Sequence, residues 1–431
     1  MQSVRDRLEI LLSRLAARAN DERVFVRLYR EAARAAAEAA DARRKAGVTL
    51  GPLDGTIVSI KDLFDIAGEP TTAGSLMLRT ATPALRDAAI VRRLRQAGAV
   101  ILGKTNMTEF AFTAIGDNQH YGTPGNASDA SLIPGGSSSG AGVSVAEGTC
   151  DIAIGSDTGG SVRIPASLNG VVGFKPTARR VPLAGAFPLS ATLDSIGPLA
   201  RSVADCAAAD AVMAGEEPAA LRPIPLADLR VGIPRGVLFD ETQPEVLDAF
   251  HRSIRGVEQA GVRVADLSID DLISEMRAAT KRASIAAIEG AEVHADWLAA
   301  GASAPVDPHV SGPLSRALTV PASIYIRTIR RRRELAAAME ERLQAFDVLA
   351  LPTTPMVAPS IAAMAADEAL RDRTEGLLLR NTQVANQFDL CAVSLPMPGM
   401  KLPAGLMLMA RRGHDRRLLG IAAAAEALLK G

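Results

Sequence analysis

The sequence predicts an α/β fold in which one sheet is covered by helices, within a single large domain over residues 1–431. Between residues 50 and 205, short apolar runs alternate with helical patterns, as expected for strands joined by helices. Strand-like runs return after residue 346, so segments far apart in the chain are expected to share one sheet. Hydrophobic residues make up 48% of the chain, which is enough for one large buried core.

The N-terminal segment and the following region predict the first elements. Residues 3–46 form two Ala-rich amphipathic helical stretches, hinged near residues 19–23 and ended by Gly47. Between residues 50 and 205, apolar runs predict strands over 55–60, 99–102, 150–155 and 170–174. Helical patterns in the same region lie over residues 86–98 and 140–148.

The rest of the chain predicts a helical elaboration followed by a return to the sheet. Residues 206–345 are expected to be mostly helical, with one strand over 229–234. Residues 346–431 are expected to begin with a strand-like run, to add strands over 391–396 and 403–410, and to end in a helix.

Composition excludes several classes of function. The 48 basic and 48 acidic residues balance, so a general binder of nucleic acid is not expected. The basic run at 327–334 is interpreted as the solvated face of a helix. Cys150, Cys206 and Cys391 have no metal or disulfide spacing, which favours a reducing cytoplasm. No apolar run approaches the length of a membrane helix, so no membrane partner is expected.

Two motifs match familiar patterns without their structural context. GAVILGKT, residues 98–105, satisfies the phosphate-loop pattern, but its four intervening residues are an apolar, strand-like run. Lys104 is therefore interpreted as a structural residue at a strand end. GSSSG, residues 136–140, satisfies the nucleophile-elbow pattern around Ser138, but a loop-like segment precedes it instead of a strand. A histidine-based hydrolase is not expected.

A third motif, GSDTGGSVRIP at residues 155–165, does follow a predicted strand. Gly159 and Gly160 allow successive backbone amides to point into one small space, which suits an oxyanion. Pro165 is compatible with the first turn of a helix, so Ser161 is expected between a strand and a helix. From these residues alone, a tight structural turn remains the alternative.

Taken together, IPGGSSSGAGVSVAEG (133–148) and GSDTGGSVRIPASLNGVVGFKPT (155–177) resemble the amidase signature family. GPLDGTIVSIKD (51–62) is similar to the strand that ends in the family's catalytic lysine. The resemblance covers residues 50–205 most clearly, as the catalytic signature region, with weaker marks toward the C-terminus. It implies the family's fold, a central mixed sheet with helices on both faces.

The resemblance implies a catalytic triad of Lys61, Ser137 and Ser161. Ser161 would be the nucleophile, Ser137 the proton relay and Lys61 the base, made neutral by burial. The family's oxyanion hole would be formed by the backbone amides of Thr158, Gly159, Gly160 and Ser161. The resemblance also implies a cis peptide bond between Gly136 and Ser137, and no metal or cofactor.

Neighbouring residues are assigned supporting roles. Ser138 is expected to form supporting hydrogen bonds, and Gly136 to make room beside the relay serine. Asp157 and Arg163 are expected to brace the turn instead of touching substrate. Met407 stands where many members carry glutamine, which weakens finer analogies of substrate.

We therefore expect a cytoplasmic hydrolase acting on a non-peptide C–N bond of a small amide-like molecule. An anilide, carbamate, urea or ester could enter the same site, and the helical middle with residues 355–409 is expected to form an apolar pocket. The alternative is a glutaminase of the A type from an aminoacyl-tRNA amidotransferase, working with partner subunits. The oligomeric state is left open, with a homodimer as one candidate.

Overall fold

The computed structural model describes residues 2–217, 219–299 and 305–430, and its strands form one mixed sheet. The strand order within the described residues is β1-β3-β2-β4-β6-β5-β10-β11-β9-β7-β8. The first six strands are β1 (Phe25–Leu28), β2 (Ile57–Lys61), β3 (Val100–Thr105), β4 (Ile152–Asp157), β5 (Val172–Lys175) and β6 (Ser195–Ala200). The others are β7 (Arg230–Arg235), β8 (Arg263–Ser268), β9 (Val348–Pro352), β10 (Cys391–Pro396) and β11 (Gly405–Ala410).

One face of the sheet is covered by helices from both halves of the chain. These are α3 (Ala89–Gln96), α6 (Val203–Ala214), α7 (Pro244–Gln259) and α15 (Asp415–Lys430), which share one apolar core with the sheet. In β4, Ile152 and Ile154 belong to this core, whereas Ala153 between them belongs to the core on the other face. The alternation follows from the period of two in a strand.

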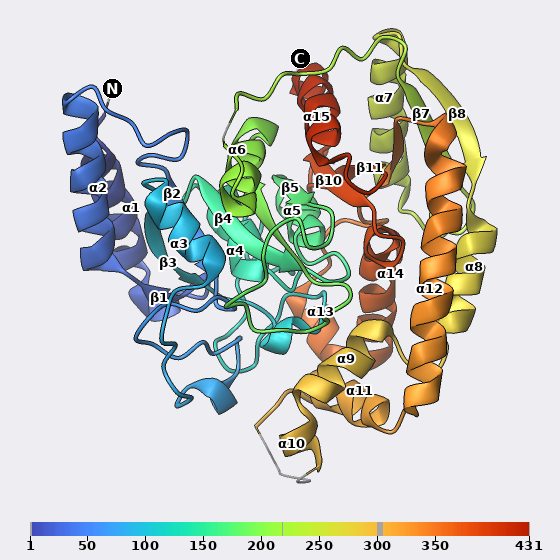
Figure 1. Ribbon diagram of the computed structural model, residues 1–431, viewed down its shortest axis with the longest axis horizontal. Coiled ribbons are helices and arrows are strands. Elements are labelled where there is room, and N and C mark those ends of the chain that lie inside the picture. The colour runs from blue at the N-terminus through green and yellow to red at the C-terminus, as the bar shows by residue number, and fades with distance from the viewer. Residues whose placement is uncertain (1, 218, 300–304, 431) are drawn as a thin grey trace.

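The opposite face carries two groups of helices. One group consists of α1 (Val4–Ala17), α2 (Arg30–Lys45), α4 (Ser139–Ala146) and α5 (Arg163–Asn169). The other consists of α8 (Asp270–Ala279), α12 (Ala322–Arg342) and α14 (Glu368–Gln387). Figure 1 shows α1 and α2 at one side of the molecule and α8 and α12 at the other. The predicted α/β fold with helices on both faces of a mixed sheet is confirmed.

The remaining helices gather at one end of the sheet. They are α9 (Ile285–Val293), α10 (Ala295–Ala299), α11 (Pro308–Leu318) and the short α13 (Ile361–Ala366). Figure 1 shows α9, α10 and α11 together at the bottom of the view, where α9 packs against α11. None of the helices within the described ranges is long and apolar enough to cross a membrane.

Three strands differ from the sequence prediction. Residues 3–46 are not only helical, because β1 lies between α1 and α2, and residues 206–345 add β8 to the expected β7. These two strands, β1 and β8, lie at the two edges of the sheet. An edge strand buries little, and every position of β8 is exposed or half-exposed, so it lacks an apolar run. The third, β6, is central but contains Gly197 and Pro198, which usually weigh against a strand.

Candidate active site

Two neighbouring parallel strands bring the predicted site residues together at their carboxyl ends. β2 pairs in parallel with β4, so the carboxyl ends of both strands meet. Lys61 is the last residue of β2, and β4 ends at Asp157, four residues before Ser161. Ser137 lies in the loop directly before α4. The fold therefore collects residues that are far apart in the sequence.

Lys61 forms its hydrogen bonds with two serines. Its Nζ atom lies 2.7 Å from Oγ of Ser137 and 2.9 Å from Oγ of Ser156. The lysine is fully buried, and burial lowers its pKa to about 7, although the carboxylates of Asp194 and Asp157 favour the charged form. A large fraction of Lys61 is thus neutral near pH 7 and can accept a proton. The contact with Ser156 was not foreseen from the sequence.

The loop that carries Ser137 has a tightly enclosed backbone. The Gly136–Ser137 peptide bond is cis, as the family resemblance implies. A Cβ atom on Gly136 would lie 2.9 Å from backbone atoms of Gly116, so only glycine fits there. The amide of Gly136 donates to the carbonyl of Ala114 at 2.6 Å, which fixes the loop against residues 111–116.

Ser161 lies in the turn between β4 and α5, as predicted. It lines a cavity of about 440 Å³, whereas Lys61 and Ser137 have no accessible surface. The Ser161 hydroxyl has no hydrogen-bond partner within the described part of the chain, so it is free to meet a ligand. The backbone amide of Ser138 donates to the Ser161 carbonyl at 3.3 Å, which joins the two loops. Of the three predicted triad members, only Ser161 reaches the cavity.

The turn from Thr158 to Ser161 offers backbone donors beside this hydroxyl. Within the described residues, the amides of Thr158, Gly159, Gly160 and Ser161 donate to no protein acceptor. Thr158, Gly159 and Ser161 line the cavity. The Thr158 hydroxyl is held by the Asp194 carboxylate at 2.5 Å, which fixes one end of the turn. Such unpaired amides are suited to bind an oxyanion.

A buried ion pair that does not line the cavity supports the turn from Thr158 to Ser161. Arg163 donates to the carboxylate of Asp157 at 2.8 and 3.0 Å, and both side chains are fully buried. Burial alone would raise the pKa of Asp157, but Arg163 holds it below its ordinary value. Asn386 of α14 accepts from Arg163 at 2.7 Å and donates to Asp157 at 2.9 Å. Neither Asp157 nor Arg163 lines the cavity, which agrees with the bracing role predicted for them.

The phosphate-loop match at residues 98–105 and the nucleophile-elbow match at residues 136–140 have the local structure that the sequence predicted. Lys104 is buried near the end of β3, with its Nζ atom 3.3 Å from carboxylate oxygens of Asp62 and Glu69. Residues 98–105 thus form a strand and its entry, not a phosphate loop. Ser138 follows a loop and its hydroxyl donates to the carbonyl of Ser156 at 3.3 Å, and no histidine lines the described cavity.

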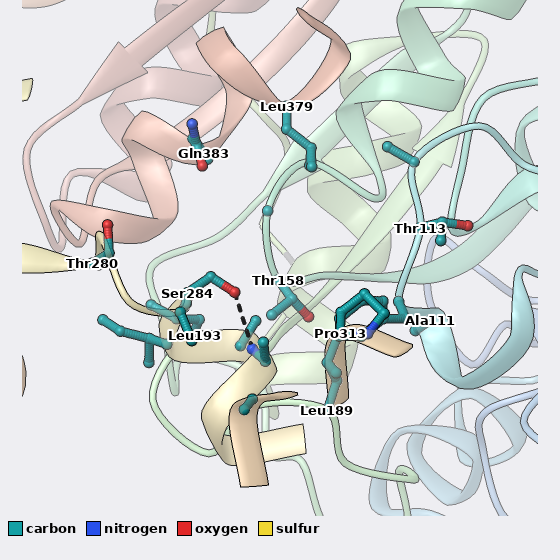
Figure 2. Close-up of a pocket in the computed structure, with 18 of the residues that line it drawn as sticks. Ala111, Thr113, Thr158, Leu189, Leu193, Thr280, Ser284, Pro313, Leu379 and Gln383 are labelled. Carbon is teal, nitrogen blue, oxygen red and sulfur yellow. Dashed lines mark hydrogen bonds between the residues drawn. The ribbon is translucent and has the colours of Figure 1, made fainter. Parts of the chain in front are cut away.

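The cavity walls come from segments that are distant in sequence. Figure 2 shows Thr158 between Ala111 and Thr113 on one side and Thr280 and Ser284 on the other. The helical middle does line the cavity, through residues 280–287 and α11. Most of the lining side chains are apolar, as expected, and residues 375–387 of the predicted C-terminal region contribute as well. No methionine is among the described lining residues, which include the polar side chains of Arg282, Arg316, Glu375, Gln383 and Gln387.

Glu375 is a wall residue that the sequence did not single out. Both of its carboxylate oxygens accept from the amide of Ala114, at 2.7 and 2.9 Å. Burial raises the pKa of this carboxyl to about 7, against the opposing effects of the Ala114 amide and Arg371. Since the carbonyl of Ala114 accepts from Gly136, Glu375 is connected through one residue to the loop of Ser137. Nothing local in the sequence marks this connection.

Comparisons with known proteins agree with the fold and the motifs. A family model described as Amidase matches residues 6–419. The chain is 36% identical over 405 residues to a 2-amino-5-chloromuconic acid deaminase of Comamonas testosteroni, covering 92% of this chain and 86% of the relative. It is 37% identical to AtzE, a 1-carboxybiuret hydrolase subunit of a Pseudomonas species, covering 83% of this chain and 80% of that one.

Other matches widen the range of activities. The A-type subunit of a glutamyl-tRNA(Gln) amidotransferase of Acidothermus cellulolyticus is 34% identical, with 96% of this chain and 89% of the relative covered. Among solved structures, a crystal structure of an amidase superposes with a TM-score of 0.88 at 32% identity, covering 99% of this chain and 96% of that chain.

Proposed function

The chain belongs to the amidase signature family and is a hydrolase acting on C–N bonds, and from this premise we propose that it cleaves a carboxylic amide of a small molecule through an acyl-enzyme on Ser161. The observation that carries the proposal is the contact of 2.7 Å between Nζ of Lys61 and Oγ of Ser137. Both side chains are buried, and Ser161, in the loop that accepts a hydrogen bond from the Ser138 amide, lines the cavity.

In the first half of the reaction, the proton is transferred as the nucleophile attacks. Neutral Lys61 takes the proton of the Ser137 hydroxyl, and Ser137 takes the proton of Ser161 as Ser161 Oγ attacks the amide carbonyl carbon. The carbonyl π electrons move to oxygen, and the negative charge is bound by amides of the turn from Thr158 to Ser161. The C–N bond then breaks, and the proton returns through Ser137 to the leaving nitrogen.

The second half repeats the relay with water. Water gives a proton to the same Lys61–Ser137 pair and adds to the acyl carbonyl, after which the ester bond to Ser161 breaks and Ser161 recovers its proton. The products are a carboxylic acid and an amine or ammonia. Anilides, carbamates, ureas and esters fit the same sequence of steps, because each presents a carbonyl carbon with a leaving nitrogen or oxygen.

A screen of these compound classes tests the proposal. Purified protein is assayed for release of ammonia, amine or alcohol from amides, anilides, ureas, carbamates and esters, beside Ser161→Ala and Ser268→Ala. Ser268 is an exposed serine on the edge strand β8, so its loss is a matched control. We expect turnover by the wild type and Ser268→Ala only. Equal turnover by Ser161→Ala and the wild type would refute the proposal.

The similarity to amidotransferase subunits of the A type supports a second candidate, a glutaminase that needs partner subunits. This candidate keeps the same acyl-enzyme chemistry and changes the substrate to glutamine. Hydrolysis of glutamine only after addition of partner subunits, with none of the screened amides turned over, would favour it. Turnover of a small amide by the chain alone favours the first candidate.

A further inference from the structure

Basic side chains outnumber acidic ones among the charged residues that line the cavity. Within the described chain they are Arg282, Arg316 and Glu375. Arg282 lies in the segment between α8 and α9, and Arg316 lies in the last turn of α11. Because α9 packs against α11, two separate segments contribute one arginine each to the lining of the same cavity. Both arginines are exposed, so their side chains are accessible from solvent.

Neither arginine has a carboxylate partner in the described structure. No ion pair and no side-chain hydrogen bond involves Arg282 or Arg316 there, whereas Arg371 of nearby α14 is paired with Asp117 at 2.6 Å. A guanidinium carries five N–H donors in a planar fork and no acceptor. These two forks are therefore available to a ligand that enters the cavity.

The acidic lining residue does not compensate for this charge. The carboxyl of Glu375 is occupied by the amide of Ala114, and burial raises its pKa to about 7. At neutral pH it therefore carries only part of a negative charge, so the charged lining is positive overall. A neutral or cationic molecule would gain little from such a lining. An anion would gain both attraction and hydrogen bonds.

We propose that the cavity binds an amide whose far end carries a carboxylate, which Arg282 and Arg316 bind while the scissile carbonyl lies at Ser161. The planar fork of arginine matches the two oxygens of a carboxylate, and such charge-assisted pairs are stronger than neutral hydrogen bonds. The substrate class is thus the monoamides of dicarboxylic acids and their close analogues. This inference rests on the proposed amide hydrolysis at Ser161.

The test compares compounds that differ only in the charge of the far end. Monoamides of linear dicarboxylic acids are assayed against the diamides of the same chain length, over a series of lengths, by ammonia release. A diamide is nearly isosteric with its monoamide but lacks the negative charge. We expect kcat/KM to be about tenfold or more higher for the best monoamide, mainly through KM, and the preference to fall with added salt.

The double variant Arg282→Gln with Arg316→Gln should reduce this preference to about twofold or less, with little effect on the diamides. The matched control is Arg327→Gln with Arg330→Gln, which removes the same charge from exposed positions of α12 that do not line the cavity. The control should keep the preference. A wild type that favours diamides, or a double variant that slows both series equally, would overturn the proposal.

A binding measurement separates this inference from the proposed chemistry. If the wild-type protein turns over no compound of any class in the screen, the proposed function fails. Calorimetry with the dicarboxylic monoamides then tests the arginines alone. Binding of the monoamides no tighter than that of the diamides, or unchanged in the double variant, contradicts the carboxylate subsite.

Discussion

The Nζ atom of Lys61 lies 2.7 Å from Oγ of Ser137 at a point in the molecule where neither side chain has accessible surface. An exposed lysine would be protonated and could not act as a base at neutral pH. Here burial lowers the pKa of Lys61 to about 7. The loop of Ser137 is joined to that of Ser161, which lines the cavity, by the hydrogen bond from the Ser138 amide to the Ser161 carbonyl at 3.3 Å.

The pH dependence of kcat/KM should report the Lys61 amine. The base must be neutral, so activity is low below the pKa and rises about tenfold per pH unit until it levels off. With a pKa of about 7, the half-maximal value is expected near neutral pH and the plateau on the alkaline side. Initial rates across buffers of constant ionic strength measure this. A flat profile between about pH 5 and 9 would rule out Lys61 as the base.

Ser137 and Ser138 are adjacent serines with different expected roles. Ser137→Ala removes the proposed proton relay and should lower kcat/KM by about 10²- to 10⁴-fold. Ser138→Ala removes only a long hydrogen bond of 3.3 Å to the Ser156 carbonyl, so a loss below about tenfold is expected. Steady-state kinetics on one amide compare the two variants. Equal losses would show that both serines support the loop without a relay.

Gly160 should tolerate substitution less than Gly159. Gly160 has φ of 146°, and a Cβ atom there would collide with Oγ1 of Thr382. A Cβ atom on Gly159 would meet only the end of the Leu379 side chain at 3.2 Å, which can move. Gly160→Ala should distort the amide donors and lower kcat by about 10²-fold or more, with a smaller loss for Gly159→Ala. Steady-state kinetics of both variants measure this, and a Gly160→Ala enzyme at the wild-type rate would contradict the oxyanion site.

The ion pair between Arg163 and Asp157 should contribute to stability. Arg163→Met leaves the Asp157 charge buried without its guanidinium partner, and the free energy of unfolding should fall by about 3–5 kcal/mol. The control is Asp266→Ala, which breaks an exposed pair with Arg235 and should cost below about 1 kcal/mol. Urea unfolding followed by circular dichroism measures both. Similar midpoints for the two variants would show that the buried pair is not needed.

The triad was predicted through the resemblance of three local stretches to the amidase signature family. Ser137 and Ser161 sit in Gly-rich stretches, and Lys61 ends an apolar strand. Each stretch is continuous in the sequence, so its resemblance to the family can be recognised without knowledge of the fold. The contact of Lys61 with Ser156 could not, since it depends on how β2 and β4 pair.

The cavity walls and the sheet edges were not predictable in the same way. Glu375 meets Ala114, and Asn386 meets Arg163, only because α14 packs back onto the signature region. No periodicity within α14 indicates which of its polar residues turn inward. The edge strand β8 was missed because it buries too little to leave an apolar pattern.

The most direct test of the proposed mechanism is to find the atom that carries the acyl group. The protein is mixed with an activated ester or amide that deacylates slowly, quenched in acid, digested and analysed by mass spectrometry. We expect an added acyl mass on the peptide that contains Ser161, and none on that peptide from Ser161→Ala. An acyl group on any other residue, or undiminished labelling of Ser161→Ala, would contradict the mechanism.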